Sequence, residues 1–357
     1  MTRVGALAAV ILVNAVGVSA QESATIKAFS KYDFVPGAEV VAFYDFMADA
    51  IGDFPGGWDT NASGEVVTIE GKPGQWLMLT KGGVFVPDLP AELPENFTLE
   101  FDVLTNTPFT SGATMSASLV SLDNVGQPAT WQGVNNRFTF TVHPTGLSGS
   151  ERRQDGTGEP AVTAQADGIA PGDIIHVSVW RQKQRVRVYF NEQKIWDLPR
   201  ALVADPGLNR VIFWVYSVDP EYQFYLGNVR LAVGAPDTRN KLVTEGRFVT
   251  HGILFDVNSD KLRGESYGTL KEIAAVLTAN ADLKVKIVGH TDADGDDAAN
   301  LDLSKRRAAS VKAALSAEFG IDAARMDTDG KGETEPADTN DTSAGKANNR
   351  RVEFIRM

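Results

Sequence analysis

The chain has 357 residues, more than one ordinary domain holds, so two or three domains are expected. Lys and Arg number 34 against 46 Asp and Glu, and the resulting net charge of −12 argues against nucleic-acid binding, which needs a basic footprint. The absence of cysteine excludes thiol catalysis, disulfides and thiolate metal sites, and the four histidines have no metal-binding spacing. We therefore expect neither a metal ion nor a cofactor.

The first twenty residues have the layout of a secretory signal peptide. A basic start at Arg3 precedes an apolar run from Val4 to Val18, and a small-x-small cleavage site ends just before Gln21. A membrane anchor, the alternative, needs about twenty apolar residues, whereas this run is shorter and contains Asn14. No cysteine follows the run, so a lipid-anchored lipoprotein is not expected. We expect residues 1–20 to be cleaved and the mature chain to be exported.

Residues 21–235 are predicted to form an antiparallel β-sandwich of the jelly-roll type. Short runs of alternating apolar and polar residues recur between clusters of Gly, Pro, Asn and Asp, and no run has convincing helical periodicity. The expected strands are Phe97–Val103, Arg137–His143, Ile174–Trp180, Arg185–Phe190, Lys194–Leu198, Arg210–Ser217 and Phe224–Val233. Residues 236–250 are interpreted as a linker that few contacts should cross, so the two halves should fold independently.

Residues 251–357 are predicted to form a small α/β domain. Apolar residues from Leu270 to Leu277 recur at helical spacing, and a longer helix is expected from Ala298 to Phe319, where Gly320 stops it. The expected strands are Gly252–Val257, Lys284–Val288, Arg325–Thr328 and Arg351–Ile355, while Gly330-Lys331-Gly332 is interpreted as a turn. The fold class is therefore a multidomain β and α/β chain.

Five separated motifs of this C-terminal part occur in a characteristic order. They are Phe255–Leu262, Gly289-His290-Thr291-Asp292, Asn300 with Leu303-Ser304 and Arg307-Ala308, the pair Gly330 and Gly332 with Pro336, and Asn349–Glu353. This series resembles the OmpA-like peptidoglycan-binding domain over residues 250–357. The resemblance implies that Asp292 and Arg307 hold diaminopimelate of the peptidoglycan stem peptide.

The chemistry of these two residues suits that ligand. Diaminopimelate presents a carboxylate and an ammonium on one short carbon chain, so its site needs one fixed cation and one fixed anion. Arg307 offers a planar fork for the carboxylate, and Asp292 offers acceptor oxygens for the ammonium. Asp292 also follows a strand, where α/β domains place ligands. The alternative is a structural salt bridge between Asp292 and Arg307.

The remaining candidates for the peptidoglycan site are weaker. Asn300 is expected to cap its helix, to bind the ligand, or to do both, and Thr291 to bind a carboxylate or to form a turn. Arg350 and Arg351 alternate along a strand, so one should face the groove and the other solvent. His290 is expected to be a packed histidine.

Asp292–Asp297 is a run rich in aspartate that has the start of a calcium-binding loop. Glycine falls at its fourth position instead of the sixth, and Leu303 stands where the twelfth position needs Glu. A solvated acidic loop is the preferred interpretation, and calcium binding is the alternative.

The N-terminal half has a more diffuse resemblance, to laminin-G or concanavalin-A-like sandwiches, through the hairpin Val177–Lys194. Such folds include laminarinase-type hydrolases, whose strand carries three acidic residues. Here Glu100 and Asp102 supply two and no third follows, so they are interpreted as the solvated face of a strand, and no enzymatic activity is expected. Six tryptophans, among them Trp131, are interpreted mainly as core, although they could stack on sugars.

These observations predict an exported, non-enzymatic cell-envelope protein of the periplasm or outer membrane of a Gram-negative bacterium. It would bind peptidoglycan through diaminopimelate, and its sandwich would be a binding or structural module for a glycan or an envelope protein. The alternatives are a carbohydrate-binding surface adhesin and an outer-membrane β-barrel with a periplasmic peptidoglycan anchor.

Overall fold

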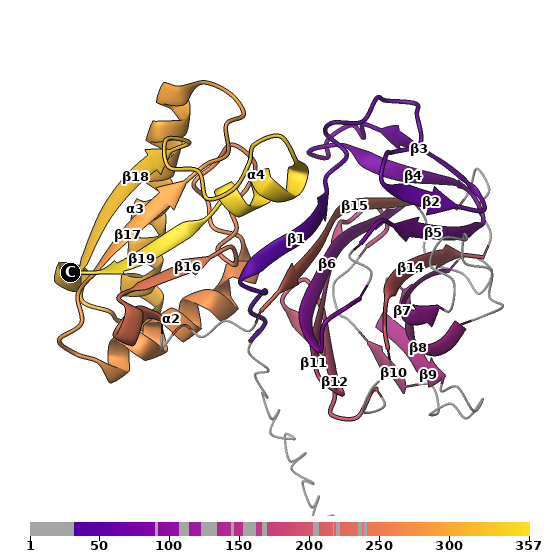
Figure 1. Cartoon of the computed structure of the whole chain (residues 1–357), viewed down its shortest axis with the longest axis horizontal. Helices are drawn as coiled ribbons and strands as arrows, with labels where there is room; N and C mark the ends of the chain where they lie inside the picture. The colour runs from indigo at the N-terminus through magenta and orange to yellow at the C-terminus, as the bar shows by residue number, and fades with distance from the viewer. Residues whose placement is uncertain are drawn as a thin grey trace, which may run out of the picture. The chain divides into compact units, whose positions relative to one another are not determined.

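A computed structural model describes Tyr32–Met357 apart from residues 90–91, 107–113, 123–133, 144–145, 153–161, 166–169, 203–206, 217, 219–221, 235–237 and 239–240 (Figure 1). Lys31–Met357 form one compact unit. The expected signal peptide and Trp131 lie outside the described residues. No helix among the described residues is long and apolar enough to span a membrane.

The N-terminal part contains two antiparallel sheets. The first has the order β13 (Gln193–Leu198), β12 (Arg185–Phe190), β11 (Ile175–Gln182), β6 (Asn96–Thr105), β15 (Phe224–Val233), β4 (Trp76–Lys81) and β3 (Ser63–Val67), with β1 (Glu39–Tyr44) paired to β15. The second has the order β10 (Val162–Gln165), β9 (Gly146–Arg152), β8 (Val134–His143), β7 (Met115–Leu122), β14 (Arg210–Val215), β5 (Gly83–Pro87) and β2 (Trp58–Thr60). Each of the seven strands expected in this part corresponds to an observed strand.

The two sheets face each other across one hydrophobic core, which makes this part a β-sandwich (Figure 1). Phe101 of β6 meets Phe213 of β14 edge to face, with 5.0 Å between ring centroids, and lies 6.4 Å from Phe140 of β8. Burial of each such ring contributes about 1.5–3 kcal/mol. Three of the tryptophans, Trp58, Trp76 and Trp196, are also buried.

The reverse face of β6 corrects one expectation. Glu100 and Asp102 were expected to face solvent, but they are only 3% and 4% exposed. The segment leading into β1 covers this face: the Gly37 N–H donates to Thr98 Oγ1 at 2.9 Å, and Tyr32 packs on Tyr189 of β12. Both faces of β6 are therefore buried, one of them apolar and the other polar. Alternation along the sequence shows which residues share a face, but it does not show whether the polar face is exposed or covered.

The buried carboxylates belong to one ionic network. His176 of β11 places Nδ1 2.6 Å from Asp102 Oδ1 and Nε2 3.4 Å from Glu100 Oε2. Arg230 of β15 pairs with Glu100 at 3.3 Å, and Asn228 donates to Asp102 at 2.7 Å. Two anions thus face two cations, which is the arrangement that buried charges require.

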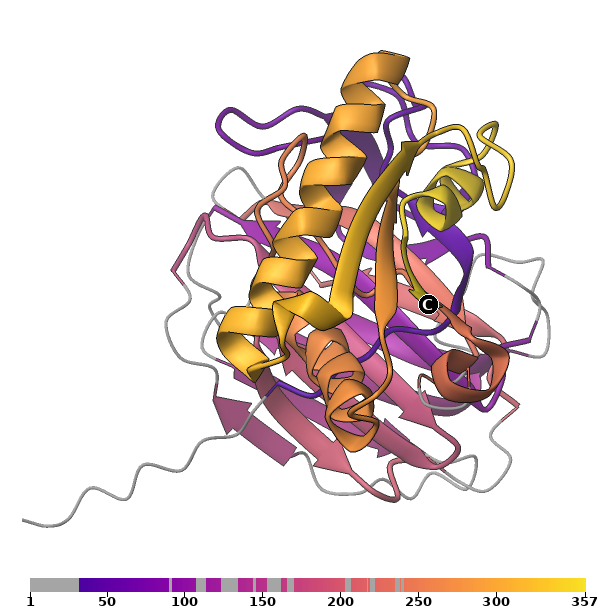
Figure 2. The same ribbon diagram turned by 90° about the vertical axis from the view of Figure 1, so that its left-hand side faces the viewer.

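The C-terminal part is a small α/β fold. Its mixed sheet has the order β16 (Arg247–Thr250), β19 (Val352–Arg356), β17 (Val285–His290) and β18 (Met326–Gly332), in which only β17 and β18 run parallel. The helical segments are η1 (Lys241–Glu245), η2 (Gly264–Ser266), α2 (Tyr267–Ala279), α3 (Asp297–Phe319), η3 (Ala323–Arg325) and α4 (Ser343–Asn349). Figure 2 shows α2 and α3 in front of the sheet, and their apolar residues share its core.

Several expectations about this part need correction. The expected linker 236–250 contains η1 and β16, so the α/β fold begins before residue 251. Gly252–Val257 is not a strand, since its only bridge joins Phe255 to Leu262. Gly330-Lys331-Gly332 lies within β18 rather than in a turn. The boundary between the halves is also crossed by contacts, including two hydrogen bonds between Val40 and Asn348, contrary to expectation.

The long helix α3 matches its predicted bounds within one residue. The Asp296 side chain caps its start by accepting the Ala299 N–H at 3.0 Å, and Gly320 ends it with a left-handed φ of 70°. The helix lies close to the sheet at two motif glycines: a Cβ at Gly289 would lie 2.3 Å from Ser304 O, and one at Gly330 would lie 2.4 Å from Lys305 N. These glycines bring α3 against β17 and β18, beside the loop that follows β17.

Candidate functional site

Asp292 stands two residues beyond the end of β17. It is 8% exposed, and Oδ1 accepts the Asp294 N–H at 3.3 Å while Oδ2 pairs with Nη1 of Arg350. Arg350 directly follows α4, and its side chain is 34% exposed. A carboxylate and a partly exposed guanidinium therefore meet just beyond the carboxyl end of a strand.

Arg307 presents a second guanidinium from α3. Its Nε donates to Ser259 O at 3.0 Å, and its guanidinium carbon lies 4.9 Å from the centroid of the Phe255 ring. Burial and the charge of Arg350 lower the pKa of Arg307, whereas Asp292 opposes the change, and arginine remains charged. Asp292 takes Arg350 as its partner, so the alternative of an Asp292–Arg307 salt bridge is not what the structure contains.

The site therefore combines two cations with one anion. Within the described part of the chain, the terminal nitrogens of Arg307 donate to no protein acceptor, so the planar fork is oriented but unsatisfied. Such a group binds a carboxylate with two hydrogen bonds. Asp292 and Arg350 partly neutralise each other, and the excess positive charge favours a ligand that carries at least one carboxylate.

Asn300 and Thr291 support the site from within the protein. Asn300 is 7% exposed, and its amide nitrogen donates to Glu333 Oε2 at 2.7 Å and to Asp294 O at 3.1 Å. It does not cap α3, because Asp296 does. Thr291 is 4% exposed and its N–H donates to Gly332 O at 2.9 Å. Both residues hold the loop that carries Asp292, and their backbone or amide donors are already in use.

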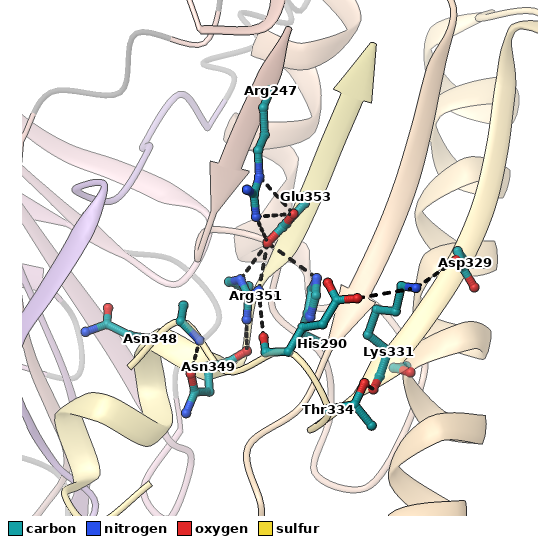
Figure 3. A network of polar contacts seen from close by, with 12 residues as sticks. Arg247, His290, Asp329, Lys331, Thr334, Asn348, Asn349, Arg351 and Glu353 are labelled. Atoms are coloured by element: carbon teal, nitrogen blue, oxygen red, sulfur yellow. Dashed lines mark hydrogen bonds and ion pairs between the residues drawn. The ribbon is translucent and has the colours of Figure 1, made fainter. Parts of the chain in front are cut away.

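Arg351 lies in a buried network instead of at the site (Figure 3). It is 6% exposed, and its Nε and Nη2 each lie 2.8 Å from Oε1 of Glu353. Arg247 donates three further hydrogen bonds to the same carboxylate. Burial opposes ionisation of Glu353, but Arg247 and Arg351 outweigh it and lower its pKa. Neither arginine of the Arg350-Arg351 pair is fully exposed, contrary to the expectation that one would face solvent.

His290 packs beside this network, as expected. It is 3% exposed, and its Nε2 lies 3.4 Å from Oε1 of Glu353. Burial and the charge of Arg351 lower its pKa to about 4, so the ring is neutral at pH 7.

The acidic loop after β17 uses its carboxylates within the protein. Asp294 pairs with Lys346 of α4 at 2.7 Å, Asp296 caps α3, and Asp292 pairs with Arg350. Two of these contacts reach α4 and the residue that follows it, so they hold the loop against α4.

Three residues near the site escaped the sequence analysis as contributors. Phe255 belongs to a recognised motif, and its aromatic side chain beside Arg307 was the available signal. Asn348 adjoins the Asn349-Arg350 motif. Phe43 lies under Arg350, with 5.4 Å between the guanidinium carbon and the ring centroid, and no pattern links residues so far apart in sequence.

The fold and the site define a small α/β domain that holds two arginines and a carboxylate at the end of its parallel strand pair. The OmpA family model matches residues 254–350, and the C-terminal part of the chain is an OmpA-family domain.

The curated relatives match the same share of the chain. The outer-membrane lipoprotein YfiB of Pseudomonas aeruginosa is 45% identical over 103 residues, which are 29% of this chain and 61% of YfiB. Outer membrane protein A of Bordetella avium is 46% identical over 101 residues, 28% of this chain and 51% of that protein. The chain thus covers less than two thirds of either relative.

Among solved structures, the peptidoglycan-associated lipoprotein from Burkholderia pseudomallei is 26% identical. The match covers 34% of this chain and 98% of that one, with a TM-score of 0.29.

Proposed function

We propose that this protein binds peptidoglycan non-covalently by holding the diaminopimelate of the stem peptide between Arg307, Arg350 and Asp292. The observation that carries the proposal is the unsatisfied fork of Arg307, held in place by Ser259 and Phe255 beside the Asp292–Arg350 pair. The OmpA-family match and the five motifs support the same ligand.

Each charged group has a distinct task in this proposal. Arg307 grips the ligand carboxylate with its two free terminal nitrogens, and Arg350 adds a second positive charge. Asp292 accepts the ligand ammonium with an oxygen while the other stays with Arg350. A ligand with an ammonium and a carboxylate on one carbon matches the signs of these charges, whereas a neutral sugar leaves the fork of Arg307 without an anionic partner.

Removal of the Asp292 or the Arg307 side chain tests the proposal. Truncating one partner of a buried, hydrogen-bonded charge pair costs about 2–5 kcal/mol, which is a loss of affinity of roughly 30-fold or more. Asp292→Ala and Arg307→Ala should each abolish sedimentation with purified sacculi, and Arg307→Lys should bind poorly because an ammonium lacks the fork. The double variant should be little worse than either single variant, since both residues serve one ligand.

Arg306 supplies the matched control for Arg307. It is the preceding residue of α3, but its guanidinium pairs with Asp260 and Asp302 on the surface. Arg306→Ala should sediment with sacculi like the wild type. Folded Asp292→Ala and Arg307→Ala variants that still bind sacculi normally would disprove the proposed site.

The cellular place follows from the same reasoning. Diaminopimelate-containing peptidoglycan lies in the periplasm of Gram-negative bacteria, and the relatives named above are outer-membrane proteins. We therefore place the protein in the cell envelope, exported by a cleaved signal peptide and without enzymatic activity. Intact mass of the exported protein tests the cleavage: a chain that begins at Gln21 is expected, and retention of residues 1–20 would contradict it.

The β-sandwich is proposed as a binding or structural module of the same protein. A glycan array probed with the full-length Asp292→Ala/Arg307→Ala variant separates the two halves, because the peptidoglycan site is then inactive. Glycan binding that persists in this variant would assign a carbohydrate site to the sandwich, and its absence would leave the structural role.

A further inference from the structure

Strand β1 of the sandwich contacts the segment that carries Arg350. The Val40 N–H donates to Asn348 Oδ1 at 3.0 Å, and Asn348 Nδ2 donates to Val40 O at 3.0 Å. The side-chain amide of Asn348 thus satisfies both backbone groups of an edge-strand residue, as a neighbouring strand would. Asn348 is 8% exposed, so this pair of hydrogen bonds is shielded from water.

Two further contacts extend along α4. Ala347 packs with Val40 and Ala232 in a small buried apolar cluster, and Ser343 Oγ lies 3.4 Å from Asp45 Oδ1. The C-terminal part of α4 is therefore attached to β1, and its first residue contacts Asp45, which directly follows β1. Since Arg350 directly follows α4, the position of its backbone depends on the sandwich.

The side chain of Arg350 is held by the same strand. Its guanidinium lies between the carboxylate of Asp292 and the ring of Phe43, 5.4 Å from the ring centroid. Phe43 is half-buried, and a cation over an aromatic face is attracted by the ring quadrupole. The ring restricts the rotation of a long side chain that would otherwise move freely around its partner.

We propose that Phe43 is a positioning residue of the peptidoglycan site, through which the β-sandwich sets the affinity of the OmpA-family domain. This inference rests on the function proposed above. Phe43 does not touch the ligand: it aligns Arg350, so that Arg350 engages only Oδ2 of Asp292 and faces the ligand carboxylate beside Arg307. The sandwich is then part of the binding unit instead of a passive neighbour.

The test compares variants of the full-length mature protein in sedimentation with diaminopimelate-containing sacculi. Phe43→Leu keeps an apolar side chain but removes the ring, and its dissociation constant should rise about 3- to 10-fold. Phe43→Tyr and Phe43→Trp keep the ring and should bind within about 2-fold of the wild type. Glu39→Ala, an exposed position on the same strand, is the matched control.

A double-mutant cycle distinguishes positioning from a merely structural role. In an Arg350→Gln background the Phe43→Leu change should have no further effect on binding, because the side chain that the ring aligns is absent. An equal loss in both backgrounds, or wild-type binding by Phe43→Leu, would overturn the inference. Failure of the wild type to bind sacculi, or normal binding by Arg307→Ala, would instead refute the proposed function itself.

Discussion

His176 remains charged although it is buried on the polar face of the first sheet. Burial opposes its protonation, but the hydrogen bonds to Asp102 and Glu100 outweigh burial and raise its pKa to about 10. Its unfolded value is 6.5, so the stabilisation is fully present below pH 6.5 and is lost as the pH rises through about 10.

Replacement of His176 by Gln should therefore destabilise the protein in a pH-dependent way. Loss of one partner from a buried ionic network costs about 3–5 kcal/mol, because Glu100 and Asp102 keep their charges without it. Urea unfolding at a series of pH values measures the free energy of unfolding of both proteins. The difference should be largest below pH 6.5 and shrink towards pH 10, and a constant difference would contradict the network.

His290 has the opposite dependence. Its pKa of about 4 in the folded protein lies below the unfolded value of 6.5, so its contribution is present above pH 6.5 and is lost as the pH falls towards 4. The difference between these two pKa values corresponds to roughly 3–4 kcal/mol. His290→Gln should lose less stability than the wild type between these pH values. At pH 8 His290 is neutral in both states, so the free energy of unfolding of His290→Gln at this pH measures only the cost of the changed packing. An acid dependence equal to that of the wild type would contradict the lowered pKa of His290.

At the scale of elements, several motif residues meet where α3 packs on the sheet. Ser304 is fully buried, and its Oγ accepts the Gly332 N–H at 2.9 Å while it donates to Leu301 O at 2.8 Å. Gly289 and Gly330 allow the helix backbone to approach β17 and β18. The motif residues therefore include those that pack α3 on the sheet, as well as Asp292 and Arg307, the groups proposed to bind the ligand.

Gly330→Ala should disturb this packing. Its new Cβ would lie 2.4 Å from Lys305 N, a backbone atom that cannot turn away. Overpacking of this kind costs about 1–3 kcal/mol, and binding to sacculi should weaken because Arg307 moves with the helix. Gly56→Ala is the control, since only Asp49 Oδ1 lies within 4 Å of the new atom, at 3.8 Å, and it should change stability by less than about 0.5 kcal/mol. Equal melting temperatures for the two variants would contradict this account.

At the scale of the whole molecule, the contacts across residues 236–250 make the two halves one unit. Asn348 joins β1, and Tyr267 of α2 packs with Phe34 and Tyr189 in an aromatic cluster. The positive charge of Arg263 in the C-terminal part also contributes to the lowered pKa of the buried Asp102 in β6. Separation of the halves would expose the apolar side chains of this aromatic cluster to water, which is costly.

We therefore expect Lys31–Met357 to unfold cooperatively. Differential scanning calorimetry of the mature protein should show a single transition, and Asn348→Ala should lower its midpoint. Two transitions, of which only one responds to Asn348→Ala, would show that the halves fold independently, as the interpretation of residues 236–250 as a linker predicted.

The sequence alone determined many of the elements of the fold and the family of its C-terminal part. Strands such as β12 and β15 follow from alternation, and α3 follows from its periodicity and from Gly320, because these signals are local. The candidates Asp292 and Arg307 came from a motif whose spacing is also readable along the chain. Local patterns of this kind need no knowledge of what packs on them.

Only the tertiary structure decided which of these groups meet. Alternation along β6 cannot show that Glu100 and Asp102 are covered by another segment, and no spacing pairs Asp292 with Arg350 or places Phe43 beneath that arginine. These contacts join residues tens to hundreds of positions apart, and they form because burial of the apolar faces fixes the chain in space. The packing of the elements then decides which charged and aromatic side chains come into contact. A pattern along the sequence does not contain this information.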